Sequence, residues 1–413
     1  MEYGLIGEKL GHSYSVPIHN QLADYGYVLR EVSPDALDAF MRRHDFRGIN
    51  VTIPYKQAVM PYCAELSDAA REVGCVNTIV VRGDSSLYGH NTDIGGFIHM
   101  LRGAGIDPSG RKAVVLGSGG TSLTARAALR RLKAREIVVV SRSGPVDYEA
   151  LYRDHADAEI LVNTTPVGMY PKTGVSPADI KRLPNLMGVA DVIYNPERTA
   201  LIADARERGI PAVSGLSMLV AQAREAAEMF AGREIPAEMV NRVCARIHAD
   251  TLNLVLVGMP GCGKSTMGRR LAAAMGREFV DCDEEIERRA GMSIPEIFAK
   301  HGEKYFRDLE SQVVSDVCKG ARLVIATGGG AVIRPENRRA MGQNGRICFI
   351  RRDVAVLSRS GRPLSSSEDA VARLWEERKE IYIQAADFTV NNDRPVDEVA
   401  NDIREAFYEA VGN

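Results

Sequence analysis

Short runs of β-branched and other apolar residues alternate along the chain with longer stretches in which apolar positions recur every three or four residues. The short runs predict buried strands, and the longer stretches predict amphipathic helices. The clearest predicted strands are residues 3–7, 49–53, 113–117, 137–140, 160–163, 189–193, 252–258, 323–327 and 347–350, and the clearest predicted helices are residues 121–132, 217–230 and 237–248. Strands that alternate with helices in this way are typical of an α/β fold with mostly parallel sheets.

The pattern changes near Ala249. A helical stretch rich in Ala, Glu and Arg ends before this residue, and the apolar strand LNLVLVG opens a new strand–helix unit after it. At 413 residues, the chain is also longer than one hydrophobic core usually organises. We therefore predict two main parts, residues 1–248 and 252–413, joined by a linker of residues 249–251.

Charge and hydropathy argue against two classes of partner. A net charge of -2 creates no field that would gather nucleic acid or an anionic membrane. No apolar run approaches the roughly 18 residues of a membrane-spanning helix. The opening residues MEYGLIGEKLGHS place no basic region ahead of an apolar stretch, so they do not resemble a signal peptide. We expect small-molecule ligands, with no nucleic acid and no membrane, and we leave homo-oligomer formation open.

The seven cysteines are odd in number, scattered along the chain, and include no CxxC pair. This pattern argues against a disulfide framework and against a zinc site. It is typical of free thiols in a reducing compartment. The expectation is a cytoplasmic protein.

A glycine-rich segment, residues 113–132 (AVVLGSGGTSLTARAALRRL), lies between a predicted strand and a predicted helix. Gly117, Gly119 and Gly120 allow a tight turn in which the backbone approaches a pyrophosphate, and the start of the helix offers free N–H groups. The third glycine of the usual fingerprint is replaced by Ser122. The flanking strand and helix nevertheless make this turn a candidate dinucleotide site. Its other members are Ser118 and Thr121.

The end of the next strand indicates which dinucleotide binds. Folds that bind NAD place an acidic residue there, which holds the ribose 2′-hydroxyl. Here the strand EIVVV runs into Ser141-Arg142-Ser143 without a carboxylate, and a guanidinium suits a 2′-phosphate. The residues favour NADPH, and the alternative is that Arg142 is a solvated surface arginine.

Polar clusters in the first half carry further candidate chemistry: HSYSVP at residues 12–17, NVTIPYK at residues 50–56, and GCVNT with GHNTD at residues 74–78 and 89–93. Taken singly, each is explained by capping and turn chemistry. Lys56 alone would be read as a surface lysine whose stem lies along apolar surface.

In order and spacing, HSYSVPIH, GINVTIPYK, VGCVNTIV, GHNTDIGGF, NTTPVGM, DVIYNP and GLSMLVAQA resemble the shikimate dehydrogenase family. The resemblance spans residues 1–248. It implies a substrate domain of residues 1–98 and 217–248 around a Rossmann NADP-binding domain of residues 99–216. The implied reaction is the reversible, NADPH-dependent reduction of 3-dehydroshikimate to shikimate.

The resemblance also implies individual roles. Ser13 and Ser15 would bind the substrate carboxylate, while Lys56, paired with Asp93, would protonate the alkoxide that develops as hydride arrives. The other implied substrate residues are Thr52, Asn77, Tyr194 and Gln222, and the implied cofactor-lining residues are Val192 and Gly215. One departure from the family is that SGPVDYE supplies no second basic residue after Arg142, so discrimination against NADH is expected to be weaker.

The second half begins with a second nucleotide motif. Residues 258–266, GMPGCGKST, fit GxxxxGK[ST] between an apolar strand and a helix, as a P-loop requires. The loop N–H groups would cradle phosphate oxygens, Lys264 would reach the β and γ phosphates of ATP, and Ser265 would ligate Mg²⁺. The other predicted nucleotide contacts in this loop are Gly261, Cys262, Gly263 and Thr266.

Two carboxylates follow in the segment FVDCD. Asp281 and Asp283 are two residues apart at a predicted strand end, so we expect them on one face of the strand. One would serve the magnesium shell and the other a substrate hydroxyl, and we assign Asp281 to the metal.

These motifs, with GEKYFRDLE, TGGGAV, GRPL and EERKEIY further on, resemble the shikimate kinase family from residue 252 to the C-terminus. The resemblance implies a P-loop kinase domain with a parallel sheet, and ATP-dependent phosphorylation of shikimate to shikimate 3-phosphate. Arg307 and Arg378 would clamp the carboxylate, and Asp283 would activate the attacking hydroxyl. Arg362 would be the lid arginine that closes on the transferring phosphate. The other implied substrate residues are Gly329 and Gly330.

We predict a bifunctional enzyme that runs two consecutive steps of aromatic biosynthesis. Two alternatives stay open at this point. One half could be a nucleotide-binding regulatory module without catalysis, although no catalytic residue of either family is missing. The first half could also use quinate, although Ser13 and Ser15 fit the shikimate-type pattern better.

Overall fold

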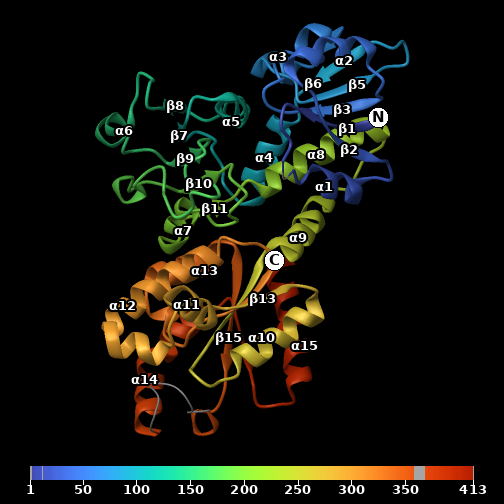
Figure 1. Ribbon diagram of the computed structural model, residues 1–413. Helices are drawn as coiled ribbons and strands as arrows, with labels where there is room; N and C mark the ends of the chain where they lie inside the picture. The colour runs from blue at the N-terminus through green and yellow to red at the C-terminus, as the bar shows by residue number, and fades with distance from the viewer. Residues whose placement is uncertain (1, 12, 358–367, 413) are drawn as a thin grey trace. The chain divides into compact units, whose positions relative to one another are not determined.

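The computed structural model of the chain describes residues 2–11, 13–357 and 368–412. It contains two compact units (Figure 1). Unit 1 comprises Met1–Gly168, Val175–Tyr194 and Leu201–Cys244, and unit 2 comprises Met169–Gly174, Asn195–Ala200 and Ala245–Asn413.

Unit 1 opens with a mixed sheet of strand order β2-β1-β3-β5-β6-β4. β1 pairs in parallel with β2 and β3, and β5 runs antiparallel to β3 and β6. Every residue of β1 is buried, as expected for a strand with neighbours on both sides, whereas most of the edge strand β2 is exposed. The strands are β1 (Tyr3–Gly7), β2 (Tyr27–Glu31), β3 (Gly48–Val51), β4 (Glu65–Leu66), β5 (Thr78–Val81) and β6 (Leu87–His90), and the helices in this region are α1 (Ser15–Leu22), α2 (Leu37–Arg43), α3 (Asp68–Val73) and α4 (Asp93–Gly103).

The second sheet of unit 1 has the order β11-β10-β9-β7-β8, and all its pairs are parallel. Along β7, Ala113 and Val115 belong to one buried cluster, while Val114 and Leu116 belong to another. Burial on both faces explains the continuous apolar runs seen in the sequence. The strands are β7 (Lys112–Leu116), β8 (Glu136–Val140), β9 (Ile160–Asn163), β10 (Gly188–Asp191) and β11 (Ala212–Val213), and the helices are α5 (Gly120–Arg131), α6 (Tyr148–Asp154) and α7 (Ala200–Glu207). Helix α8 (Leu216–Ala231) follows β11 and packs against α4 and α1.

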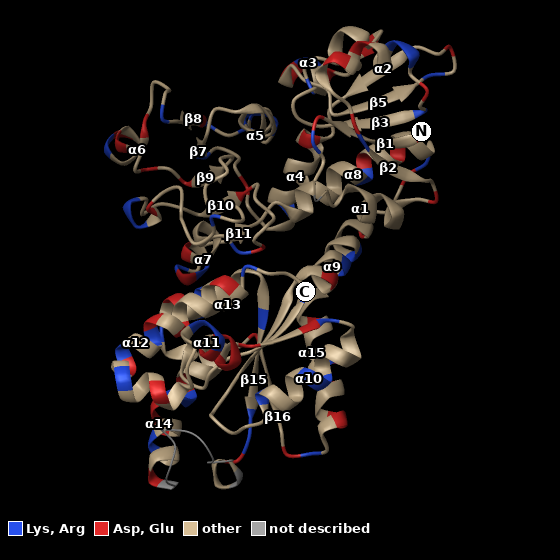
Figure 2. Ribbon diagram, in the orientation of Figure 1, with Lys and Arg blue, Asp and Glu red and all other residues tan. Residues whose placement is uncertain are grey.

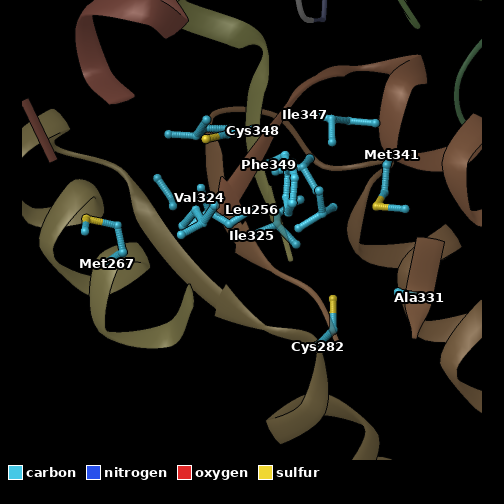
Figure 3. Packing of buried hydrophobic residues seen from close by; sticks show 14 of the residues in the cluster. Leu256, Met267, Cys282, Val324, Ile325, Ala331, Met341, Ile347, Cys348 and Phe349 are labelled. Carbon is cyan, nitrogen blue, oxygen red and sulfur yellow. The ribbon is translucent and has the colours of Figure 1, made fainter. Parts of the chain in front are cut away.

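Unit 2 is built on an entirely parallel sheet of order β13-β14-β12-β15-β16. Figure 3 shows its core, in which Leu256, Ile325 and Phe349 of the central strands pack with Met267 of α10 and Met341 of α13. The strands are β12 (Asn253–Val257), β13 (Glu278–Asp281), β14 (Leu323–Ala326), β15 (Gly345–Arg351) and β16 (Phe388–Asn391). The helices are α10 (Lys264–Met275), α11 (Cys282–Ala290), α12 (Ile294–Val317), α13 (Pro335–Gln343), α14 (Glu368–Ala385) and α15 (Val396–Gly412).

The nine predicted strands are present, each with ends within two residues of those expected. The predicted linker is wrong. Helix α9 (Met239–Thr251) continues through residues 249–251, and β12 begins at Asn253. No glycine or proline interrupts this stretch, and the Thr251 hydroxyl donates to the Ile247 carbonyl one turn earlier, so the helix does not end at residue 248. The domain boundaries proposed from the sequence stay a prediction.

Charges of both signs lie along α12 (Figure 2).

The seven cysteines are free thiols. Within the described ranges, no helix combines the length and the apolar character needed to cross a bilayer.

Candidate active sites

Lys56 and Asp93 form an ion pair in unit 1. Lys56 follows β3, and Asp93 opens α4; the Lys56 Nζ donates to the Asp93 Oδ2 at 2.7 Å. Burial lowers the pKa of the Lys56 ammonium, but the adjacent Asp93 raises it by more, so that the net pKa lies above its ordinary value. The Lys56 side chain remains 30% exposed. The pair is therefore a charged acid with access to a ligand, which suits proton delivery to a developing oxyanion.

Amides and hydroxyls hold Asp93 from the other side. The Asn77 Nδ2 donates to the Asp93 Oδ1 at 2.9 Å, and the Asn77 Oδ1 accepts from the Thr92 backbone N–H at 2.9 Å. The Thr92 hydroxyl donates to the Gln222 Oε1 at 3.2 Å, which joins α8 to this network. The carboxylate consequently has a fixed orientation.

Lys56, Asn77, Asp93 and Gln222 line a cavity of about 410 Å³ in unit 1. The structure brings together every predicted substrate residue of the first half around it: Ser13, Ser15, Thr52, Lys56, Asn77, Asp93, Tyr194 and Gln222. Of the predicted cofactor residues, Thr121, Val192 and Gly215 also line the cavity. A side chain on Gly215 would collide with the carbonyl of Val192, so glycine is required at that position.

The predicted dinucleotide turn lies between β7 and α5. Gly117 has a φ of 104°, and a Cβ there would lie 2.9 Å from the Thr164 Oγ1, so only glycine suits this turn. Gly119 precedes α5 and Gly120 opens it, and a Cβ on either would meet open space. Residues 118–121 are exposed at the start of this helix, where N–H groups without helical partners can meet an anion.

Two further residues, Ser122 and Arg142, lie at the predicted dinucleotide site. Ser122, which replaces the third fingerprint glycine, is buried, and its Oγ has no hydrogen-bond partner among the described residues. Arg142 is exposed and lies two residues beyond the end of β8. A residue just beyond β8, the strand that follows the glycine turn and its helix, is well placed to contact a phosphate on the ribose.

The P-loop lies between β12 and α10. The buried Lys264 donates through Nζ to the carbonyls of Gly258 at 2.9 Å and Met259 at 3.1 Å. The Asn392 Nδ2 donates to the Cys262 carbonyl at 2.7 Å, and a Cβ on Gly263 would lie 2.8 Å from the same nitrogen. The predicted loop residues Gly261, Cys262, Gly263, Lys264, Ser265 and Thr266 therefore belong to one turn that opens α10.

The two carboxylates of FVDCD are not on one strand face, so that prediction is wrong. Asp281 ends β13 and caps α11, and its Oδ1 accepts from the backbone N–H of Asp283 at 3.0 Å. Asp283 lies in the first helical turn. The Ser265 hydroxyl donates to the Asp281 Oδ2 at 2.6 Å, so the two predicted metal ligands are adjacent.

The glycine segment 328–330 joins the predicted substrate residues of unit 2. A Cβ on Gly328 would lie 2.8 Å from the Asp283 Oδ1, and one on Gly330 would collide with the guanidinium of Arg307. The Arg378 Nη1 donates to the Gly329 carbonyl at 3.2 Å. Two arginines and one carboxylate thus converge on a stretch of backbone where a side chain would displace them.

Several residues at these sites lie in or near the motifs, but the sequence alone assigned them no role. Glu310 is buried and accepts from the Arg307 Nη1 at 2.8 Å; burial raises the pKa of the Glu310 carboxyl and Arg307 opposes that shift. Tyr382 donates to the Gly329 carbonyl. Asn50 and His19 line the unit 1 cavity. Helical spacing was an available signal, because Glu310 follows Arg307 by three residues and Tyr382 follows Arg378 by four. Arg362, the lid arginine predicted from the sequence, lies outside the described residues.

Comparisons with known proteins agree with this geometry. A family model for the shikimate dehydrogenase substrate binding domain matches residues 5–79. Shikimate dehydrogenase (NADP(+)) of Clostridium perfringens is 36% identical over 263 residues, which cover 56% of this chain and 93% of that protein. The chain belongs to the shikimate dehydrogenase family. Residues 260–408 match the family model for shikimate kinase, so the chain also carries a shikimate kinase domain.

Solved structures extend the match for the dehydrogenase part. A chorismate mutase/shikimate 5-dehydrogenase fusion protein from Clostridium acetobutylicum shares 36% identity at a TM-score of 0.55, over 58% of this chain and 94% of that one. Quinate dehydrogenase from Corynebacterium glutamicum, in complex with NAD, shares 28% identity at a TM-score of 0.53, over 59% of this chain and 96% of that one. With the kinase match, these similarities confirm the predicted fold class.

Proposed function

We propose that the chain is a bifunctional enzyme that reduces 3-dehydroshikimate to shikimate with NADPH and phosphorylates shikimate at its 3-hydroxyl with ATP. The observation that carries the proposal is the pairing of two sites for one small hydroxylated acid. One is the cavity around Lys56 and Asp93, and the other is the cluster of Asp283, Arg307 and Arg378 at the glycine segment. We assign the first activity to residues 1–248 and the second to residues 252–413.

In the reduction, NADPH supplies the hydride to the carbonyl carbon of the ring. Lys56 gives its proton to the carbonyl oxygen as negative charge develops there, and Asp93 holds the ammonium in place at 2.7 Å. Ser13 and Ser15, whose hydroxyls lie 3.0 Å apart, bind the carboxylate of the acid. The remaining polar groups of the cavity bind the ring hydroxyls: Thr52, Asn77, Tyr194 and Gln222.

In the phosphorylation, Arg307 and Arg378 bind the carboxylate of shikimate, and Asp283 orients and deprotonates the attacking hydroxyl. Glu310 keeps Arg307 in position through a buried ion pair. Lys264 and the loop N–H groups bind the phosphates of ATP. Arg362, on the sequence resemblance alone, is the lid arginine of this proposal.

Arg142 is predicted to select NADPH over NADH. In Arg142→Ala, the KM for NADPH should rise at least about tenfold, because a charge-assisted contact to the 2′-phosphate is lost, while the KM for NADH should change little. Steady-state rates with each cofactor measure the two values. Arg153→Ala, which alters an exposed arginine paired with Asp154, should leave both unchanged. Equal effects on the two cofactors in Arg142→Ala would contradict the assignment.

The kinase half is predicted to require Mg²⁺. Ser265 and Asp281 present adjacent hard oxygen ligands, and among the described residues no group of three or more His, Cys, Asp or Glu side chains could hold a different metal site. Magnesium bound at this pair would neutralise charge on the ATP phosphates. Treatment with EDTA should abolish shikimate phosphorylation, and added Mg²⁺ should restore it, while NADPH oxidation by 3-dehydroshikimate should continue. Loss of both activities, or of neither, would argue against this site.

Quinate is a second candidate substrate for the dehydrogenase half, favoured by the similarity to a quinate dehydrogenase. The serine pair on the carboxylate side favours shikimate. Oxidation of shikimate and of quinate by NADP⁺ on the intact chain, alongside ATP consumption with shikimate, tests the proposal. A chain that oxidises only quinate, or that does not consume ATP with shikimate, would reject the corresponding half.

A further inference from the structure

A buried cluster of polar aromatic rings lies beside the cavity of unit 1. The His19 and Tyr27 rings stack at 3.8 Å and 5°, and a hydrogen bond of 2.8 Å joins the His19 Nδ1 to the Tyr25 hydroxyl. His19 is only 1% exposed and Tyr27 4% exposed. Burial lowers the pKa of His19 to about 3, so the ring is neutral near pH 7 and adds no positive charge to the cavity that it lines.

The Tyr27 hydroxyl bonds to a residue of the cavity wall. It donates to the Asn50 Oδ1 at 2.6 Å. An amide has one acceptor end and one donor end, so this bond determines which way the Asn50 amide points. Its Nδ2 then donates to the Thr78 Oγ1 at 3.0 Å and to the Asn77 carbonyl at 3.3 Å. Asn50 and Thr78 are direct partners in the β3–β5 ladder, which brings the two side chains together.

From Thr78 the hydrogen bonds continue to the proposed acid. The Thr78 hydroxyl donates to the Asn77 Oδ1 at 3.1 Å, and the Asn77 Nδ2 donates to the Asp93 Oδ1 at 2.9 Å. Lys56 completes the series at the Asp93 Oδ2. An unbroken chain of hydrogen bonds therefore links Tyr27 to Lys56, and each bond determines the orientation of the next polar group.

We propose that Tyr27 is a positioning residue for the dehydrogenase reaction, acting through Asn50 and held in place by the stacked His19. The inference rests on the proposed function of the first half. Two neighbouring tyrosines show that a buried tyrosine hydroxyl does not need a side-chain acceptor. Tyr3 donates to the Phe230 carbonyl at 3.2 Å and Tyr55 to the Val32 carbonyl at 2.6 Å, so a buried hydroxyl in this sheet region can be satisfied by backbone. Tyr27 bonds instead to a side chain of the cavity.

The test compares Tyr27→Phe with Tyr3→Phe in the intact chain, each removing one buried hydroxyl. In Tyr27→Phe, kcat/KM for shikimate oxidation should fall about five- to tenfold, since one hydrogen bond that orients the site is lost. The KM for shikimate should rise, while the KM for NADP⁺ and the kinase rate should stay within about twofold of wild type. Tyr3→Phe should leave both KM values unchanged, because its partner lies outside the cavity.

A double-mutant cycle with Asn50→Ser separates positioning from general stability. If Tyr27 acts through Asn50, then Tyr27→Phe should have less than about a twofold effect in the Asn50→Ser background. Two effects that multiply independently, or a Tyr27→Phe variant that behaves like Tyr3→Phe, would overturn the inference. An inactive wild-type dehydrogenase would instead reject the proposed function and the premise of this inference with it.

Discussion

Replacing Lys56 with alanine is expected to reduce dehydrogenase turnover by about 10²- to 10⁴-fold, the range expected for loss of a general acid. Burial lowers the pKa of Lys56, but the partner Asp93 brings it above its ordinary value, so the ammonium stays protonated through neutral pH and is available as the acid in the wild type. Because Lys56 lies in the substrate cavity and not in the glycine turn, NADPH binding should persist. NADPH oxidation with 3-dehydroshikimate and NADPH fluorescence titration measure the two properties.

Lys181→Ala is the matched control for this prediction, because Lys181 is an exposed lysine of unit 1 outside the cavity. It should retain full dehydrogenase activity. The kinase activity of both variants should equal that of the wild type. Near-normal turnover in Lys56→Ala would remove this lysine from the mechanism.

Asp283→Asn is expected to produce the corresponding loss in the kinase half, again about 10²- to 10⁴-fold in kcat. The amide is close in shape to the carboxylate but cannot accept the proton of the attacking hydroxyl. Asp283 lies beside Gly328 at the start of α11, next to the segment contacted by Arg378 and Arg307. Shikimate-dependent ADP formation measures the rate, and the KM for ATP should change little because the P-loop is untouched.

The adjacent Glu284→Gln serves as its control. Glu284 is exposed in the same helical turn and pairs with Arg269 on the surface. A surface ion pair contributes little, so this variant should keep kinase activity and stability close to wild type. An Asp283→Asn variant that phosphorylates shikimate at more than about a tenth of the wild-type rate would require a different base.

Much of the fold was predictable because its central strands, such as β1, β7 and β12, are buried along their whole length. Ala113–Leu116 form a short continuous apolar run followed by glycines, which is typical of a covered parallel strand, and the turns after β7 and β12 contain glycines at positions that exclude other residues. The junction near Ala249 was not predictable in the same way. A helix end at residue 248 would be expected at a glycine or proline, and residues 239–252 contain neither.

Some site residues could be predicted from the sequence and others could not. Lys56 and Asp93 are 37 positions apart, so their pairing was predicted from the family resemblance and not from spacing. Asp281 and Asp283 were misplaced, because alternation holds only while the strand continues, and Asp281 instead caps a helix. Tyr27 was missed, and Asn50, although part of the NVTIPYK cluster, received no role, since their bond depends on how distant strands pair.

One incubation of the intact chain tests the central claim most directly. It contains 3-dehydroshikimate, NADPH, ATP and Mg²⁺, and the product is identified by mass spectrometry. The account predicts shikimate 3-phosphate, with one NADPH oxidised and one ATP consumed per ring, and none of this product when NADPH is omitted. A purified chain that yields no phosphorylated ring acid with both cosubstrates present would contradict the account.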